Sequence, residues 1–159
     1  MKPRVGISAC LLGEAVRYDG GHKLDKPLLD ALGPLVEWVP VCPEVESGMP
    51  VPRPTLDVRR DAPGEAPRVV IHGTGEDVTA MLIDWSSRRL DDLEALALSG
   101  FVLKSRSPSC GLLPRDGRGI FAAALTERFP DLPVREEGEL TDAAARQRFL
   151  EAVLAHAAG

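Results

Sequence analysis

Short apolar runs typical of β-strands alternate, over most of this chain, with segments whose apolar residues recur at helical spacing. The predicted strands occupy residues 5–8, 35–41, 68–72, 101–105 and 132–135. The predicted helices occupy residues 24–32, a segment that follows Thr74–Asp77 and ends at Gly100, and residues 120–129 and 141–158. This alternation favours a parallel sheet covered by helices. We predict a Rossmann-like α/β fold, with a mostly parallel sheet of about four to five strands and flanking helices.

Prolines and caps refine this pattern. Pro40 cannot donate a backbone hydrogen bond, so strand 35–41 is expected to end early or to lie at an edge of the sheet. Residues 43–67 contain six prolines and are predicted to form a long irregular loop, of the kind that often serves as a lid or a binding loop. Thr74–Asp77 resembles a capping box and is predicted to open the helix that follows it.

The length and charge of the chain narrow the class of protein. Its 159 residues suit one domain, 1–159. The net charge of -5 argues against a general polyanion binder, since such proteins usually carry a basic surface. No segment has the length and apolarity of a membrane helix, and the N-terminus lacks the apolar run of a secretory signal. We expect a cytoplasmic protein.

The three cysteines stand at corresponding places in this pattern. Cys10, Cys42 and Cys110 each follow a predicted strand. Because the carboxyl ends of parallel strands share the sheet edge where ligands bind, we expect the three thiols to lie together. A free cysteine is most often a small buried hydrophobe, and that alternative stays open for each of them.

Three thiolates would be soft metal ligands, which favour zinc, copper(I) or an iron–sulfur cluster. The spacing matches no short Cys-x-x-Cys motif and does not choose between these metals. A four-iron cluster usually takes four cysteines, so three would leave one iron open to water or substrate. If His22 were a fourth ligand, the site would be a closed structural Cys₃His zinc site.

Five motifs, in this order, resemble the small desulfidase family typified by bacterial 2-thiouracil desulfidase: ISACLLG, RYDG, CPEV, GMPVPR and KSRSPSCG. The resemblance implies a [4Fe-4S] cluster held by Cys10, Cys42 and Cys110. It also implies the desulfuration of thiolated pyrimidines, which releases uracil and sulfide. The sulfur of the thione would bind the iron that has no protein ligand.

The resemblance further bears on the substrate. Larger relatives that act on thiouridine in RNA carry an added C-terminal domain, whereas this chain ends at Gly159. A thiolated free base or small nucleoside is therefore expected as the partner, rather than RNA. A cluster protein that senses redox state and binds another protein is a further alternative, which only turnover would exclude.

The CPEV motif supplies the predicted proton carrier. Glu44 lies two residues after Cys42, and the resemblance places a catalytic glutamate in this motif. The alternative is a solvated loop carboxylate, which is the usual state of a glutamate and the better explanation for Glu46.

The loop KSRSPSCG supplies further candidates. The resemblance implies a catalytic serine in this loop, and we assign that role to Ser105, with Lys104 compensating negative charge on the cluster and the leaving sulfide. Ser107 is predicted to contact substrate, and Ser109 is the remaining candidate. For two of these three serines we expect only an ordinary turn or cap hydroxyl.

The segment RYDGGHK contains a turn signal, Asp-Gly-Gly. Tyr18 and Lys23 are predicted to border the substrate pocket. A simple turn with exposed charge explains this segment equally well.

Overall fold

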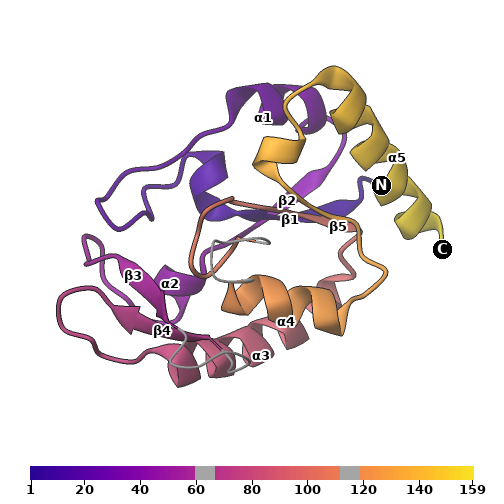
Figure 1. Ribbon diagram of the computed structural model, residues 1–159. Coiled ribbons are helices and arrows are strands. Elements are labelled where there is room, and N and C mark those ends of the chain that lie inside the picture. The colour runs from indigo at the N-terminus through magenta and orange to yellow at the C-terminus, as the bar shows by residue number, and fades with distance from the viewer. Residues whose placement is uncertain (60–66, 112–118) are drawn as a thin grey trace.

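A four-stranded parallel sheet organises the computed structural model, which describes residues 1–59, 67–111 and 119–159 (Figure 1). The strand order is β2-β1-β5-β6, and each neighbouring pair is parallel. The strands are β1 (Arg4–Ser8), β2 (Glu37–Val41), β5 (Gly100–Leu103) and β6 (Val134–Glu136). The predicted α/β fold class is confirmed, and β2, which contains Pro40, is an edge strand as expected.

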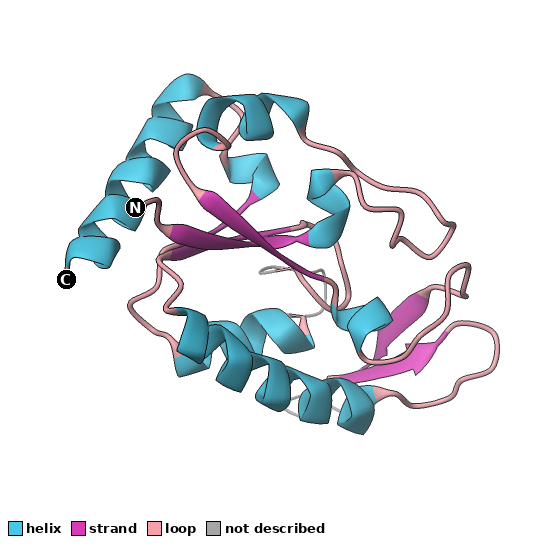
Figure 2. Cartoon of the chain, turned by 180° about the vertical axis from the view of Figure 1, so that it is seen from behind, coloured by secondary structure: helices cyan, strands magenta, loops and turns pink. Residues whose placement is uncertain are grey.

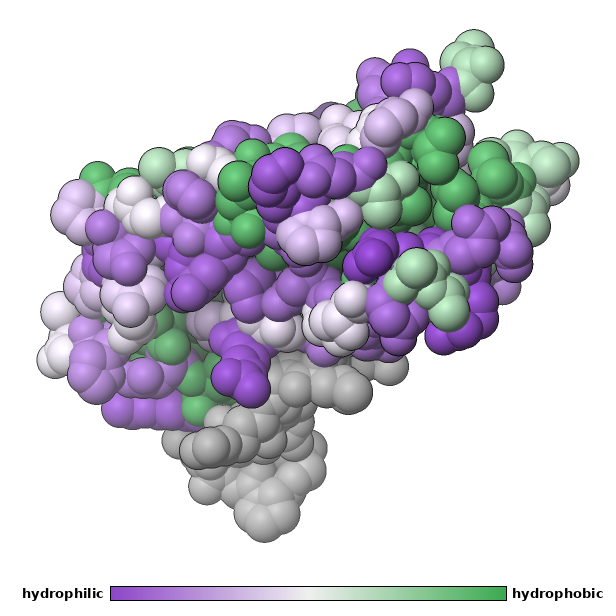
Figure 3. Space-filling view, turned by 90° about the horizontal axis from the view of Figure 1, so that it is seen from above, coloured by the Kyte–Doolittle hydropathy of each residue, from purple (hydrophilic) through white to green (hydrophobic). Residues whose placement is uncertain are grey.

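Helices cover both faces of this sheet (Figure 2). On one face, α1 (Lys26–Leu32) and α5 (Ala143–Ala158) pack their apolar residues, such as Leu28 and Phe149, against Val5 and Ile7 of β1. On the other face, α3 (Thr79–Leu96) and α4 (Ile120–Arg128) pack against β5. The face seen from above is largely hydrophilic, with apolar residues scattered over it and more numerous toward one end (Figure 3). The two cores fix the sheet, and with it the positions of the strand ends.

Gly6 has a packing role in the centre of the sheet. It is the partner of Phe101 in the register of β1 and β5. A side-chain carbon at position 6 would collide with the ring of Phe101, which is fully buried. Any larger residue would therefore push apart the two strands that lead to Cys10 and Cys110.

The predicted third strand lies outside the parallel sheet. It forms β4 (Arg68–Ile71), which pairs antiparallel with β3 (Leu56–Arg59) in a separate two-stranded sheet. A parallel pairing would need a crossover of a dozen or more residues between the strands, and the chain between β3 and β4 is shorter than that. The prediction of one irregular loop over residues 43–67 is therefore wrong in part. That stretch contains β3 and the short helix α2 (Pro43–Glu46), while its residues 60–66 lie outside the described residues.

The boundaries of α3 also differ from the prediction. Thr74 and Asp77 do not form a capping box. Oγ1 of Thr74 accepts a hydrogen bond from the Glu76 N–H, and the Asp77 carboxylate accepts one from the N–H of Thr79, where the helix begins. The helix ends at Leu96 rather than at Gly100, which is the first residue of β5.

Within the described residues, we found no helix that is both long enough and apolar enough to span a membrane.

Candidate functional site

Three neighbouring strands of the parallel sheet each lead directly to a cysteine. Cys10 lies in a 3-10 turn, η1 (Ala9–Leu12), immediately after β1. Cys42 stands between β2 and α2, and Cys110 lies in the loop after β5. Because β2, β1 and β5 are parallel and adjacent, these loops leave the same edge of the sheet, on the side away from both chain termini (Figure 1). The juxtaposition predicted from the sequence is present.

This edge of the sheet is hollowed into a cavity of about 470 Å³. The cavity collects residues from η1, from the segment around Tyr18, from α2 and from the loop after β5. The cavity is lined by all nine residues that the sequence analysis assigned to the cluster, to catalysis or to substrate binding: Cys10, Tyr18, Lys23, Cys42, Glu44, Lys104, Ser105, Ser107 and Cys110.

Burial dominates the ionisation of the three thiols. It raises the pKa of Cys10 to about 11 and that of Cys110 to about 12, and it raises the pKa of Cys42 as well. Charge repulsion from Cys42 also raises the pKa of Cys10 and of Cys110, and Cys10 raises that of Cys110, so the sulfur atoms are close enough to interact. Bare thiolates would be unfavourable here, whereas a bound cation would stabilise them and release their protons. This donor set fits a metal group that takes three thiolates.

A single metal ion and a cluster need different arrangements of the three thiols. In the described part of the chain, no group of three or more His, Cys, Asp or Glu side chains is arranged to hold one metal ion. Thiolates that bind different irons of a cluster need not converge on one point. His22 is exposed, its Nδ1 accepts a hydrogen bond from the Leu24 N–H, and it is not among the lining residues of the cavity. The structure therefore does not support the Cys₃His zinc alternative.

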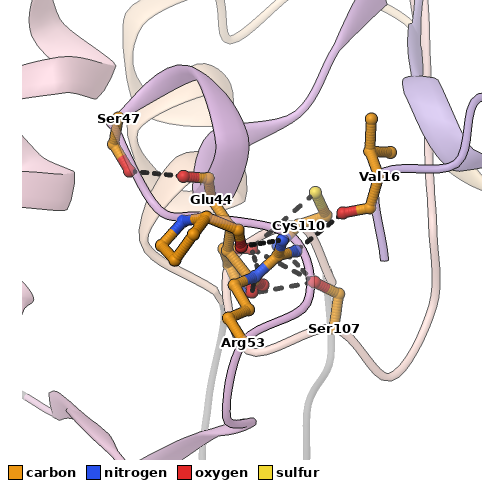
Figure 4. A network of polar contacts seen from close by, with 8 residues as sticks. Val16, Glu44, Ser47, Arg53, Ser107 and Cys110 are labelled. Atoms are coloured by element: carbon orange, nitrogen blue, oxygen red, sulfur yellow. Dashed lines mark hydrogen bonds and ion pairs between the residues drawn. The ribbon is translucent and has the colours of Figure 1, made fainter. Parts of the chain in front are cut away.

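Glu44 points into the cavity from α2 and is held there by two side chains (Figure 4). Nε of Arg53 lies 2.9 Å from Oε1 of Glu44, and these side chains are only 5% and 13% exposed. Oγ of Ser109 donates a 3.1 Å hydrogen bond to Oε2. Glu44 is therefore a fixed, largely buried carboxylate beside Cys42 and Cys110, and not the solvated loop residue of the alternative interpretation.

Arg53 was not identified by the sequence analysis as a site residue. Its guanidinium also donates to the carbonyl of Val16 at 2.7 Å and to that of Pro50 at 3.1 Å. It thus joins α2, the segment before Tyr18 and the proline-rich loop. Arg53 is the last residue of the GMPVPR motif, and this position was the one sequence signal that could have identified it as a site residue.

The serines of the loop after β5 have three different surroundings. Ser109, and not Ser105, contacts Glu44. Oγ of Ser107 accepts hydrogen bonds from the N–H groups of Ser109 and Cys110, which shapes the turn that carries the thiol. Ser105 is bonded to Glu137, a residue that the sequence analysis did not single out. One of the three, Ser107, thus has the turn role that was expected for two.

Lys104 and Ser105 share one carboxylate. Nζ of Lys104 lies 2.9 Å from Oε1 of Glu137, with side-chain exposures of 17% and 16%. Oγ of Ser105 donates to the same oxygen at 2.6 Å. Lys104 therefore lines the cavity and at the same time forms an ion pair with Glu137.

Tyr18 and Lys23 lie on the segment that closes one side of the cavity. The carbonyl of Tyr18 accepts a hydrogen bond from the Arg53 N–H at 2.8 Å, and the N–H of Lys23 donates to the carbonyl of Cys10 at 2.9 Å. The Tyr18 side chain is 40% exposed. Backbone hydrogen bonds thus attach this segment to Cys10 and to Arg53, the ion-pair partner of Glu44.

Glu46 is not the solvated carboxylate that the sequence suggested. Its Oε2 accepts a 2.7 Å hydrogen bond from the Cys42 N–H, and its Oε1 lies 3.0 Å from Nε of Arg89. Burial raises the pKa of Glu46, against the opposing effects of these two partners. Glu46 therefore supports the backbone at Cys42.

Ser8 is a second residue that the sequence analysis missed. It is the last residue of β1 and is 2% exposed. Its Oγ accepts a hydrogen bond from the Lys104 N–H at 2.9 Å, and a hydrogen bond between Ser8 and Cys110 lowers the pKa of that thiol against the larger effect of burial. Ser8 therefore links the β1 and β5 sides of the site.

Comparisons with known proteins place this geometry in a family. Residues 5–137 match the family model described as 2-thiouracil desulfurase. The uncharacterized protein YbbK of Bacillus subtilis (strain 168) is 30% identical over 112 residues, which are 66% of this chain and 71% of YbbK. A solved structure named as the [4Fe-4S]-dependent thiouracil desulfidase TudS is 34% identical, with a TM-score of 0.73 over 90% of this chain and 96% of that one.

These findings confirm the resemblance that the five motifs predicted and, at the level of the family, the prediction of an enzyme. The family match runs from β1 to the residue after β6 and so includes every strand of the parallel sheet and all three cysteines. The chain belongs to the 2-thiouracil desulfurase family.

Proposed function

We propose that this protein is a [4Fe-4S]-dependent desulfidase that converts thiolated pyrimidines of the 2-thiouracil type to uracil and sulfide. Family membership supports the reaction class, and the cofactor agrees with the name of the structural relative. The observation that carries the proposal is the meeting of three thiols, from three adjacent strand ends, in one cavity with Glu44.

Cys10, Cys42 and Cys110 would hold the cluster. When bound by three thiolates, it supplies one iron without a protein ligand, a Lewis acid with affinity for the thione sulfur. Lys104 and Arg17 favour the thiolate form of Cys10, acting against the larger effect of burial. The protein thus places positive charge where thiolates must form.

Glu44 is the group that would carry the proton. The reaction adds water at the carbon that loses sulfur, and a proton acceptor within hydrogen-bond reach of that water assists this step. Arg53 and Ser109 hold the two carboxylate oxygens in place, which leaves Glu44 oriented before substrate arrives. Such preorganisation lowers the cost of reaching the transition state.

Ser105 and Lys104 would complete the catalytic groups, while Tyr18, Lys23 and Ser107 would border the bound pyrimidine. The cavity volume falls in the range of small-molecule sites, which supports a free base or small nucleoside. The domain assignment 1–159 and the preference against RNA belong to the same proposal.

Anaerobic purification followed by iron and sulfide analysis and a 2-thiouracil assay tests this function. We expect about four irons per chain, and uracil and sulfide in equal amounts. Colourless protein with one zinc per chain would instead indicate a structural metal site. A fully loaded cluster without turnover of any thiolated base or nucleoside would favour the redox-sensing alternative.

A further inference from the structure

We propose that Glu137 is a positioning residue that fixes Ser105 and Lys104 at the mouth of the cavity and holds the Ser105 hydroxyl as a hydrogen-bond acceptor toward substrate or water. This inference rests on the proposed function for the role of Ser105. Glu137 itself does not line the cavity, so it would act through its two neighbours.

The sheet register brings Glu137 to this place. Glu136, the last residue of β6, pairs with Leu103, the last residue of β5. Glu137 and Lys104 are the next residues of the two parallel strands. A capping box between Glu136 and Glu139 fixes the turn η2 (Glu137–Glu139) in which Glu137 lies. The carboxylate is therefore presented to the start of the ligand loop from rigid backbone.

Three donors converge on the Glu137 carboxylate. The N–H of Ser105 donates to Oε2 at 2.7 Å, while Oγ of Ser105 and Nζ of Lys104 approach Oε1 at 2.6 Å and 2.9 Å. Nζ of Lys104 also donates to the Ser105 carbonyl at 2.9 Å. A carboxylate can accept all of these bonds, whereas an amide has one accepting oxygen and would turn its NH₂ group toward a donor.

The hydroxyl of Ser105 has a single hydrogen, and Glu137 accepts it. Nζ of Lys104 approaches Oγ at 3.4 Å and takes one of its lone pairs, the other lone pair remains, and Ser105 lines the cavity. Ser105 can then accept a hydrogen bond from a ring N–H of the pyrimidine or from the reacting water. The Ser105 hydroxyl is therefore not free to donate to the leaving sulfide. Of these two side chains, only Lys104 offers a positive charge to stabilise that sulfide.

The backbone of the loop also needs an external restraint. Arg106, the next residue, has φ of 58°, a left-handed conformation that is unfavourable for a side chain of this size. Ser105, which donates two hydrogen bonds to Glu137, is the residue immediately before Arg106. Glu137 thus holds the strained entry of the loop that carries Cys110.

The first test uses apoprotein and is independent of the reaction. Hydrogen exchange at the backbone N–H of Ser105 should be faster in Glu137→Gln than in the parent, because that N–H loses its hydrogen bond to a carboxylate oxygen. Glu127→Gln is the control: it makes the same chemical change at an exposed position on α4 and should leave exchange at Ser105 unaltered. Equal exchange in the parent and Glu137→Gln would overturn the proposed restraint.

The second test uses anaerobically loaded protein and a double-mutant cycle. Rates per cluster in Glu137→Gln should fall about 10–100-fold with little change in KM, as for other residues that orient active-site ligands, and Glu137→Asp should recover part of the loss. Glu137→Gln combined with Ser105→Ala should lose less than the product of the two single losses, because part of the effect of Glu137 acts through Ser105. A parent rate in Glu137→Gln, or losses that multiply, would overturn the proposal. If the parent itself produces no uracil, the proposed function fails, while the exchange result still decides whether Glu137 restrains the loop.

Discussion

Arg53 and Glu44 form an ion pair at 2.9 Å that is almost entirely shielded from solvent. The pair joins the proline-rich loop to the helix that follows Cys42, and Arg53 also binds the Val16 carbonyl. Removing one partner of a buried pair leaves an uncompensated charge, which costs about 3–5 kcal/mol.

Replacement of Arg53 should therefore impair both stability and activity. Arg53→Met is expected to lower the free energy of unfolding of apoprotein by about 3–5 kcal/mol in urea. Arg53→Lys keeps the charge but cannot reach Glu44 and both carbonyls together. It should fold, load its cluster and desulfurate slowly. An Arg53→Lys protein with the parent rate would show that the fixed geometry of Glu44 is unimportant.

Glu44→Gln should separate cluster assembly from turnover. Gln keeps the shape of the side chain but does not exchange a proton at neutral pH, so the rate should fall by roughly 10²–10⁴-fold while the visible absorbance of the cluster persists. Glu127→Gln, an exposed change on α4, is the matched control. Glu46 is unsuitable as a control because it binds the Cys42 N–H. Near-parental turnover in Glu44→Gln would remove Glu44 from the mechanism.

Ser109→Ala should be more harmful than the sequence suggested. Ser109 is 1% exposed and donates to Glu44, so its loss leaves one carboxylate oxygen without that donor. The loss of one preorganised donor can cost roughly 10²–10³-fold in rate. We expect a fall in kcat at normal iron content, measured anaerobically. If only the lifetime of the cluster in air changes, the contact with Glu44 has no catalytic consequence.

The stability of apoprotein should depend on Glu137 in a pH-specific way. Burial would raise the pKa of Glu137, but hydrogen bonds from Ser105 and Lys104 outweigh it and lower the pKa below its ordinary value of 4.5. A lowered pKa means that the native state binds fewer protons, so this contribution is complete above about pH 4.5 and is lost as the pH falls through the native pKa.

Urea denaturation of the parent and Glu137→Gln across this range measures the contribution. The parent should be more stable at pH 7 by about 1.5–3 kcal/mol, the range for hydrogen bonds to charged groups. The difference should shrink toward zero in acid. A difference that does not change with pH would mean that the ionised carboxylate is not what stabilises this region.

The sequence predicted the sheet and the positions of the cysteines because both depend on local signals. A short apolar run followed by Ser, Pro or Gly indicates where a strand ends, and parallel strands bring such ends together. β3 was hidden in the proline-rich segment, where four apolar or charged residues give too weak a pattern for a strand. Without β3 as a pairing partner, the position of β4 outside the main sheet could not be predicted.

The partners of the site residues were not predictable in the same way. Glu137 and Ser105 are 32 residues apart in the chain, and only the register of β5 and β6 brings them together. Ser8 is typical of the last residue of a strand, and only the adjacent position of β5 makes it a partner of Lys104. Such contacts depend on how elements pack, which a periodic pattern in one segment does not contain.

The iron content and desulfuration rate of Cys10→Ser, Cys42→Ser and Cys110→Ser, purified anaerobically beside the parent, test the central claim most directly. Hydroxyls replace thiolates poorly on a soft metal site, so each variant should lose most of its iron and its activity toward 2-thiouracil. A variant of any one of these cysteines that keeps about four irons per chain and the parent rate would contradict the three-thiolate cluster.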